Sequence, residues 1–509
     1  MKKILLLCLL MLTLVLTLAS CKGRKLEYEL NEDGKGYTVV GIGDYDSEKL
    51  VIPAFYKFKP VTAIGEEAFF RCKNITSVKM SNRITSVGFC AFSGCENITS
   101  VKMSNRITSI GSGAFDNCYG LKSITIPDNV TSIGDGAFCG CISLKSITIP
   151  DSVTFIGDYA FIYCKSLTSV TIPDSVTSIG YRAFSCCTSL TNITIPDNVT
   201  SIGDDAFCEC TSLTSINVPD SVTSIGIDAF YSCTSLTSIN IPDSVISIGD
   251  SAFCGCTSLT SITVDADNQY YTSIDGNLYT KDEKTLIQYA IGKTNSEFTI
   301  PDSVTSIGDW AFHDCTSLTS ITIPDSVTYI GDYAFYYCTS LTSVTIPDSV
   351  TYIGSSAFDC CTSLTGVYVT DIVSWCNIEF GGPGANPLYY ADNLYLNGEL
   401  LRELVIPEGV TSISYSAFDG CTSLESVIIP DSVTEIGPNS FYGCESLTSI
   451  NIPDSVISIG DWAFYYCTSL NEINFGGTVE QWSNITKHGP WDYNTGDYTV
   501  YCTDGEIKK

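Results

Sequence analysis

The sequence predicts an α/β solenoid, a right-handed array in which each 23-residue unit supplies one parallel strand and a short helix. Three observations lead to this fold class. From Gly65 onward one phrase returns every 23 residues, and fifteen copies cover 345 of the 489 residues that follow residue 20. Each copy alternates β-branched and polar residues, as half-buried strands do. No copy has enough apolar surface to fold alone, so neighbouring copies have to stack into a continuous core.

The strand opens each copy. In Leu167–Pro173 the apolar residues alternate with polar ones, so one face is expected to point inward and the other to solvent. Pro173-Asp174-Ser175 then ends the strand, because proline cannot donate to a ladder and aspartate supports a turn with its own side chain.

A second extended run, Val176–Ile179 in the same copy, is expected to bury two more residues. Gly180 follows, and glycine at this position would allow a left-handed turn. Only Ser414 breaks the glycine column. The pattern Asp-x-Ala-Phe-x-x-Cys then predicts one or two helical turns, with the aspartate as a cap and with Ala, Phe and Cys pointing inward.

Two longer intervals interrupt the period, 59 residues from Gly249 to Gly308 and 60 from Gly354 to Ser414. The first contains two strand-like runs and predicts a hairpin protrusion. The second contains Asn397-Gly398 between alternating runs, a strong hairpin signal. Its Trp375-Cys376-Asn377-Ile378 returns near the end as Trp482-Ser483-Asn484-Ile485, which suggests that a terminal cap was copied into the interior.

The amino terminus has the features of a secretion signal. A basic start precedes the apolar run Ile4–Leu18, which is too short for a comfortable transmembrane helix. Leu18-Ala19-Ser20-Cys21 resembles the lipobox of bacterial lipoproteins, which implies lipidation of Cys21 and cleavage before it. Several acyl chains would anchor the protein stably to a membrane that it does not span. The alternative is an ordinary signal peptide cut nearby, with Cys21 incidental.

The repeat itself, with its Ile-Pro, Ile-Gly, Ala-Phe and Cys positions, resembles the leucine-rich repeats of BspA-like bacterial surface proteins, also called the Treponema type. The lead-in includes Asn31-Glu32-Asp33-Gly34, which predicts a hairpin turn, and looks like an amino-terminal cap. The predicted organisation is a signal peptide at 1–20, an N-terminal cap at 21–60, leucine-rich repeats at 61–263, 300–364 and 406–474, a hairpin island at 264–299, a cap-like island at 365–405 and a C-terminal cap at 475–509.

Composition excludes several functions. The net charge of −30 repels nucleic acid and anionic lipid, so neither is an expected direct partner. The two histidines, His313 at an exposed variable position and His488 in the tail, have no nucleophile or paired acid at a recognisable spacing. We therefore expect no catalysis and no cofactor. A metal site is also not expected, because the cysteine pairs lack further ligands and the turn aspartates, such as Asp174, are better explained as turn formers.

Twenty-five cysteines in an exported chain suggest disulfides. Fifteen of them occupy one column of the repeat, where successive Cβ bonds would run parallel about 4.8 Å apart, whereas a bridge needs them to converge. We interpret the column as buried thiols that fill small sites in the core.

Two surfaces are candidates for binding. Aromatic residues around Ala-Phe suit contact with a protein, because such residues dominate interface hot spots. The candidate residues are Tyr333, Tyr336, Tyr337, Trp462, Tyr465 and Tyr466. The strand face instead carries hydroxyl columns that include Thr148, Thr171 and Thr194, which could match a glycan or a crystalline surface.

The family resemblance implies adhesion, to host matrix proteins, other cells or immune receptors, at the bacterial cell surface or outer membrane. A glycan-binding or crystal-binding module and a passive structural component stay open as alternatives.

Overall fold

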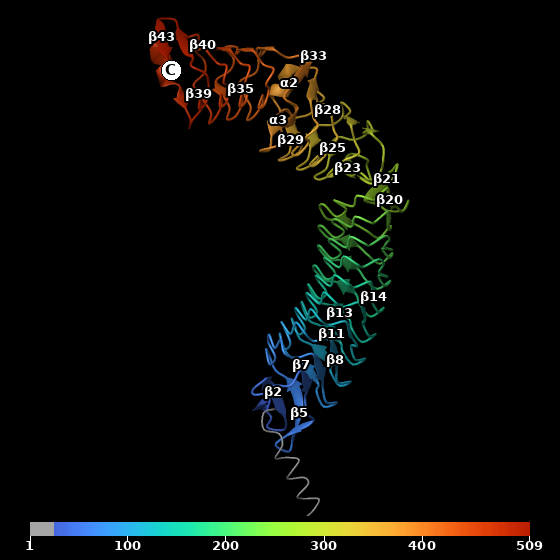
Figure 1. The fold of residues 1–509 in the computed structure, drawn as a ribbon. Helices are drawn as coiled ribbons and strands as arrows, with labels where there is room; N and C mark the ends of the chain where they lie inside the picture. The colour runs from blue at the N-terminus through green and yellow to red at the C-terminus, as the bar shows by residue number, and fades with distance from the viewer. Residues whose placement is uncertain (1–24) are drawn as a thin grey trace, which may run out of the picture. The chain divides into compact units, whose positions relative to one another are not determined.

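The computed structural model describes residues 25–509 (Figure 1). The signal peptide predicted over residues 1–20 and the lipid predicted on Cys21 lie outside the described residues. The chain divides into two compact units, Met1–Phe253 and Cys254–Lys509. Within each unit the copies stack through parallel strands, so the predicted solenoid of 23-residue turns is confirmed. Its right-handed winding stays a prediction.

Most copies contribute to two ladders of parallel strands, whereas one was predicted. The Leu-x-x-Ile run forms the main ladder, in which Ser146 pairs with Ser169 and Thr148 with Thr171. The Val-Thr-Ser-Ile run forms a second ladder, in which Ile179 pairs with Ile202. Both ladders pair residues 23 positions apart, so equivalent side chains of successive copies lie over one another.

In unit 1 the second ladder extends the cap hairpin, whose turn is confirmed by the bond from the Gly34 N–H to the Asn31 carbonyl. Its sheet comprises β1 (Glu27–Leu30), β2 (Tyr37–Gly41), β4 (Phe55–Tyr56), β5 (Lys59–Ile64), β7 (Ser86–Val87), β9 (Ser109–Ile110), β11 (Ser132–Ile133), β13 (Phe155–Ile156), β15 (Ser178–Ile179), β16 (Ser201–Ile202), β17 (Ser224–Ile225) and β19 (Ser247–Ile248). The main-ladder strands are β3 (Lys49–Val51), β6 (Ser77–Lys79), β8 (Ser100–Lys102), β10 (Ser123–Ile124), β12 (Ser146–Thr148), β14 (Ser169–Thr171) and β18 (Ser238–Ile241).

In unit 2 each ladder is divided between two sheets. The main-ladder sheets hold β24 (Glu297–Thr299), β26 (Ser320–Thr322), β28 (Ser343–Thr345), β30 (Gly366–Val369), β32 (Leu394–Leu396) and β33 (Glu399–Leu400), then β34 (Glu403–Val405), β36 (Ser426–Ile428), β38 (Ser449–Ile452), β40 (Glu472–Phe475), β42 (Thr499–Cys502) and β43 (Gly505–Lys508). The second-ladder sheets hold β21 (Tyr271–Ile274), β22 (Asn277–Thr280), β23 (Thr285–Gln288), β25 (Ser306–Ile307), β27 (Tyr329–Ile330), β29 (Tyr352–Ile353) and β31 (Glu379–Phe380), then β35 (Ser412–Ile413), β37 (Glu435–Ile436), β39 (Ser458–Ile459) and β41 (Thr486–Lys487). Strand β20 (Ser261–Val264) precedes β21.

The helix predicted after each turn glycine is wrong. The segment around Ala-Phe-x-x-Cys instead forms tight turns, and alternate N–H groups bond to the next copy, with Tyr159 donating to the Tyr181 carbonyl at 2.7 Å and Phe161 to Ala183 at 2.8 Å. An α-helix would use those N–H groups within its own segment. The helices of the described chain are α2 (Ile372–Cys376), α3 (Leu388–Ala391) and α4 (Val479–Asn484), which lie outside the regular copies.

The turn glycines also act differently from expectation. None of the fourteen has a positive φ. They are points of close backbone approach, because a Cβ on Gly111 would lie 2.7 Å from the carbonyl carbon of Gly88 in the preceding copy. A serine is accommodated at position 414 because this copy contacts α2 instead of another turn glycine. The Ser414 hydroxyl donates to the carbonyl of Cys376, the last residue of α2, at 2.9 Å.

Ala, Phe and Cys of the copies point into the core, as predicted, except that Cys72 of the first copy is only partly buried and that Ser440 replaces Ala in the copy of Gly437. The phenyl rings stack along it, with the ring centroids of Phe115 and Phe138 5.6 Å apart and 4° from parallel. The Cys141 thiol is fully buried and donates to the Phe115 carbonyl at 3.3 Å. Burial raises the pKa of Cys141 well above its usual value, so it stays protonated at neutral pH.

The two islands are built into the stack. In the first, β21, β22 and β23 form an antiparallel meander, and β23 continues in parallel to β25, with Leu278, Tyr279 and Leu286 fully buried. It is therefore part of the core rather than the protrusion that was predicted. In the second, β30, α2, β31 and the β32–β33 hairpin have the same order as β40, α4, β41 and the β42–β43 hairpin at the carboxyl end.

Candidate binding surface

The tight turns create a face of the solenoid distinct from both strand ladders. We define the turn face as the surface made by the first, second, fifth and sixth residues after the turn glycine of each copy. The second and sixth residues have left-handed backbone, with φ of 59° at Tyr159 and 60° at Tyr163. Equivalent residues of successive copies lie side by side, because the N–H groups between them bond from copy to copy.

The predicted residues Tyr333, Tyr336 and Tyr337 lie together on this face. We call the first cluster these three with Trp310 and His313. The ring centroids of Trp310 and Tyr333 are 4.2 Å apart and nearly parallel, and those of Tyr336 and Tyr337 are 4.8 Å apart. Tyr337 is the most exposed of the three tyrosines, at 44%.

His313 was expected to be exposed, and this is wrong. Only 5% of its surface is accessible, because its ring stacks on Tyr336 with centroids 5.4 Å apart and lies beside Trp310. Its Nδ1 atom lies 3.2 Å from a carboxylate oxygen of Asp314. The His313 ring is therefore a buried part of the first cluster, packed against Trp310 and Tyr336.

The second predicted set, Trp462, Tyr465 and Tyr466, also lies together. With Tyr442 and Tyr493 it makes the second cluster. Tyr465 stacks on Tyr442 at 5.1 Å and on Tyr493 at 5.4 Å, so the cluster runs across consecutive copies into the carboxyl-terminal segment. Trp462 and Tyr466 are more than 40% exposed.

Left-handed backbone is a property of the repeat at the second and sixth positions, where non-aromatic residues such as Glu67, Arg71 and Cys90 also have it. Trp310, Tyr333, Tyr337, Trp462 and Tyr466 all have φ between 54° and 60°, a region that costs an L-residue about 1–2 kcal/mol. Other copies place glycine at these positions, among them Gly113, Gly136 and Gly443. The positive φ is therefore set by the repeat, and the aromatic residues share it with the equivalent residues of other copies.

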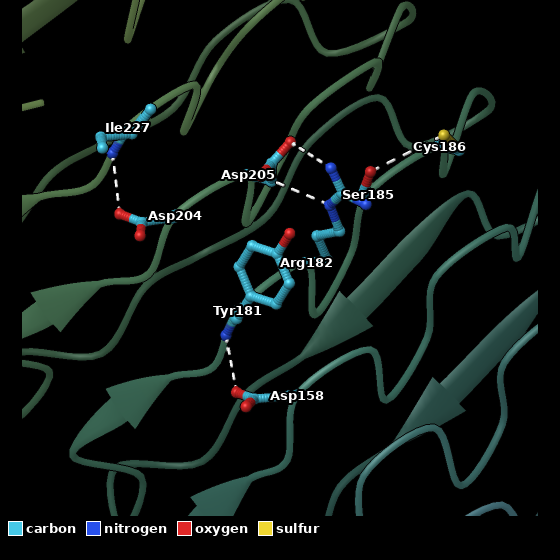
Figure 2. A network of polar contacts seen from close by, with 8 residues as sticks. All are labelled: Asp158, Tyr181, Arg182, Ser185, Cys186, Asp204, Asp205 and Ile227. Atoms are coloured by element: carbon cyan, nitrogen blue, oxygen red, sulfur yellow. Dashed lines mark hydrogen bonds and ion pairs between the residues drawn. The ribbon is translucent and has the colours of Figure 1, made fainter. Parts of the chain in front are cut away.

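In unit 1 the turn face is more polar, and Figure 2 shows its bonds between copies. Asp158 accepts the Tyr181 N–H at 2.8 Å, and Asp204 accepts the Ile227 N–H at 2.8 Å. Arg182 reaches Asp205 in the next copy, with Nε 3.3 Å from Oδ2. The aspartate predicted to cap a helix thus caps the backbone of the following copy.

The hydroxyl columns of the strand face are in register. Thr148 pairs with Thr171, and Thr171 with Thr194, and all three side chains are exposed. The exposed hydroxyl columns on which the alternative of a glycan-binding or crystal-binding module depends are therefore regular.

A groove that sequence reasoning missed lies on the turn face of unit 2, beside the second cluster. It has a volume of about 370 Å³ and is lined by Tyr389 and Tyr390 of α3 and by Tyr415, Tyr442 and Trp462 of the repeats, together with Asp359, Asp419 and Asn439. The adjacent tyrosines of α3 were the only available signal, because the repeat period does not place an island against later copies.

The described residues also bear on other chemistry. Within residues 25–509, no three His, Cys, Asp or Glu side chains are grouped closely enough to hold a metal ion. In the same part of the chain, no helix has the length and apolar character needed to cross a membrane. His488 is exposed in the carboxyl-terminal segment.

Comparison with known proteins identifies the repeat. Residues 48–168, 154–283, 287–377 and 391–486 match the family described as BspA type leucine rich repeat region. No curated protein matches significantly.

Three similar solved structures are of bacterial proteins. A leucine-rich repeat protein from Bacteroides ovatus shares 28% identity over 94% of this chain and 98% of its own, with a TM-score of 0.47. A leucine rich cell surface protein from Faecalibacterium prausnitzii shares 31% identity over 91% and 96%, with a TM-score of 0.40. A leucine-rich repeat protein from Eubacterium ventriosum shares 23% identity over 95% and 97%, with a TM-score of 0.46.

Proposed function

This chain belongs to the family of BspA-type leucine-rich repeat proteins, and on that premise we propose that it binds a protein ligand through the aromatic clusters of its turn face. Repeat solenoids present extended surfaces that suit recognition of other macromolecules. The observation that carries the proposal is the gathering of Trp and Tyr side chains on the turn face, with Tyr337, Trp462 and Tyr466 exposed. Exposed aromatic residues of these types dominate interface hot spots, so their clustering favours a role in contact.

The proposed ligand is a host matrix protein, another cell or an immune receptor, and the proposed role is adhesion at the bacterial surface. A strongly acidic chain favours partners with basic surface regions. The clusters contain the residue types that dominate protein interfaces, and they lie on the turn face, outside both strand ladders. No catalytic step is part of this proposal.

Binding assays with matched variants test which face is used. Immobilised mature chain, residues 21–509, is compared with two triple variants that replace Tyr333, Tyr336 and Tyr337, or Trp462, Tyr465 and Tyr466, by serine. Matrix proteins such as fibronectin serve as probes. At least one triple variant should lose about thirtyfold in affinity, since a hot-spot loss of about 2 kcal/mol gives that factor.

The matched control changes Thr148, Thr171 and Thr194 to lysine on the strand face, and it should retain binding. The rival glycan or crystal-surface function predicts the reverse result, with loss only in the threonine variant and with glycans as ligands. A passive scaffold would bind neither class of probe. Circular dichroism of every variant shows whether the fold survived.

We also propose a lipid on Cys21 as the anchor, based on Leu18-Ala19-Ser20-Cys21. Replacing Cys21 by alanine should release the protein from the membrane fraction or leave it unprocessed. Membrane retention of a processed Cys21→Ala protein would sink the anchor proposal without affecting the binding proposal.

A further inference from the structure

The residues that line the groove of unit 2 indicate which chemical group of a partner it could recognise. It lies where α3 of the second island meets the turn segments of the copies that follow. The island holds this position firmly, because Asn386 donates to the Ser416 carbonyl at 2.6 Å and Trp375 donates to the Ala417 carbonyl at 2.9 Å. Asp419 lies two residues after Ala417 in the chain.

Hydrogen-bond donors of the groove already have acceptors within the protein, whereas two of its buried acceptor oxygens have no donor. The Tyr390 hydroxyl donates to Asp359 Oδ1 at 2.6 Å, and Asn439 Nδ2 donates to the Tyr415 hydroxyl at 3.5 Å. In contrast, Asp419 Oδ1 and Asn439 Oδ1 are buried atoms with no donor. A buried oxygen without a donor is costly, so a ligand rich in donors would be stabilised here.

Charge and ring chemistry favour the same kind of ligand. Two carboxylates, Asp359 and Asp419, line the groove, and its lining contains no lysine or arginine. The rings of Tyr389, Tyr390, Tyr415, Tyr442 and Trp462 surround them. Aromatic faces attract cations within about 6 Å of the ring centre.

From these observations we infer that the groove binds the cationic head of a lysine or arginine side chain presented by the protein partner. An ammonium offers three donors and a guanidinium five, and neither brings an acceptor that would need a donor. A sugar brings acceptors along with its hydroxyl donors, which this groove is less able to satisfy. The inference rests on the proposed protein recognition and names the group that is read.

Asp419 makes the binding depend on pH. Burial raises its pKa to about 7, against a smaller lowering by the Ser416 hydroxyl. The titratable groups that interact with it are the Tyr442 hydroxyl and the Cys444 thiol. Burial raises the pKa of both, so both stay neutral over this pH range and the charge that changes is that of Asp419. Affinity for a cation should therefore rise as the pH rises from 6 to 8, while Asp419 ionises.

Titration of the mature chain with small probes tests the inference. The probes are the Nα-acetyl methylamides of lysine, arginine and norleucine, with a neutral monosaccharide as a fourth, and binding is followed by NMR of the probe or by calorimetry. The lysine or arginine derivative should bind at least tenfold more tightly than the norleucine derivative. Asp419→Asn should weaken that binding at least tenfold and abolish its pH dependence.

Asp325→Asn, at an exposed turn elsewhere in unit 2, is the matched control and should change nothing. Equal binding of the lysine and norleucine derivatives, or binding of the sugar instead, would overturn the inference. Asp419 lies outside both aromatic clusters. If Asp419→Asn leaves fibronectin binding intact while the aromatic triple variants lose it, the groove inference fails and the proposed function stands.

Discussion

The turn glycine of each copy is a contact between two backbones, and a methyl group tests that role. On Gly111 a Cβ would lie 2.7–2.8 Å from backbone atoms of Val87 and Gly88, whereas on Gly308 only the Leu286 carbonyl oxygen comes as close as 3.0 Å. Gly111→Ala should cost on the order of 1–3 kcal/mol by overpacking, and Gly308→Ala clearly less. Thermal unfolding of the two variants measures this, and equal losses would contradict the close-approach explanation.

Residues in left-handed backbone should respond differently from their neighbours. Tyr337 has a φ of 58°, whereas the adjacent Tyr336 does not have a positive φ. The Tyr336 ring contacts the rings of Trp310, His313 and Tyr333. Tyr337→Asn should leave stability within about 1 kcal/mol of the wild type, because relief of strain offsets the lost ring contacts. Tyr336→Asn should destabilise more. Chemical denaturation of both checks the order, and a larger loss at Tyr337 would show that the strain argument is wrong.

The Asp419 carboxyl links stability to pH with a definite sign. Its folded pKa of about 7 lies above the usual value of 3.8 for an aspartate, so the folded state holds more protons between these values. Stability should therefore fall as the pH rises from about 4 to 7, by at most about 1.4 kcal/mol per pH unit, and the penalty should persist above pH 7.

Melting curves at pH 5 and pH 8 test this dependence. Asp419→Asn should match the wild type at pH 5 and be more stable at pH 8. Asp228 provides a comparison in unit 1, since burial and the nearby Asp205 raise its pKa to about 6. The loss of stability caused by its ionisation should therefore be complete at a lower pH than the loss caused by Asp419. A variant that is less stable than wild type at pH 8 would contradict the assignment.

At the scale of the element, the phenyl stack is the main support of each copy. Phe207 lies 5.7 Å from Phe184 and 5.6 Å from Phe230, ring to ring, and is fully buried. Phe207→Ala should cost about 3–5 kcal/mol, and because each copy contacts mainly its neighbours, the effect should fade along the stack.

Hydrogen exchange resolves that fading. Exchange should rise most in the copies around Phe207 and little near Gly460, whereas Ile227→Ala, at an exposed position, should change little anywhere. A uniform loss of protection along the chain would be incompatible with coupling between nearest neighbours.

The sequence predicts most of each element but not the bonds between copies. Apolar residues spaced as Ala-Phe-x-x-Cys fit one turn of helix and a pair of tight turns equally well. What decides between them is the set of N–H groups, such as those of Tyr159 and Phe161, that bond to the following copy. A single copy gives no sign of that ladder, and therefore neither the absence of a helix nor the strained aromatic positions could be predicted.

At the scale of the whole molecule, the 23-residue period predicts the solenoid and the alignment of equivalent residues. That alignment places Trp310 and Tyr333, which occupy the same position in successive copies, in a stack with ring centroids 4.2 Å apart. The period does not apply to the islands, so the burial of the first island and the groove beside α3 required the structure. The groove combines Asp359 and Tyr390 with Asp419, and no repeat rule places these residues together.

The central claim is that partners bind the turn face, and hydroxyl-radical footprinting of a complex with a matrix protein tests it most directly. Radicals modify exposed aromatic and aliphatic side chains, so Tyr337, Trp462 and Tyr466 report on the turn face, and Val405 and Ile428 report on the main ladder. The partner should protect Tyr337 or the pair Trp462 and Tyr466 and leave Val405 and Ile428 as reactive as in the free chain. Protection of Val405 and Ile428 with no change at the aromatic residues would contradict it.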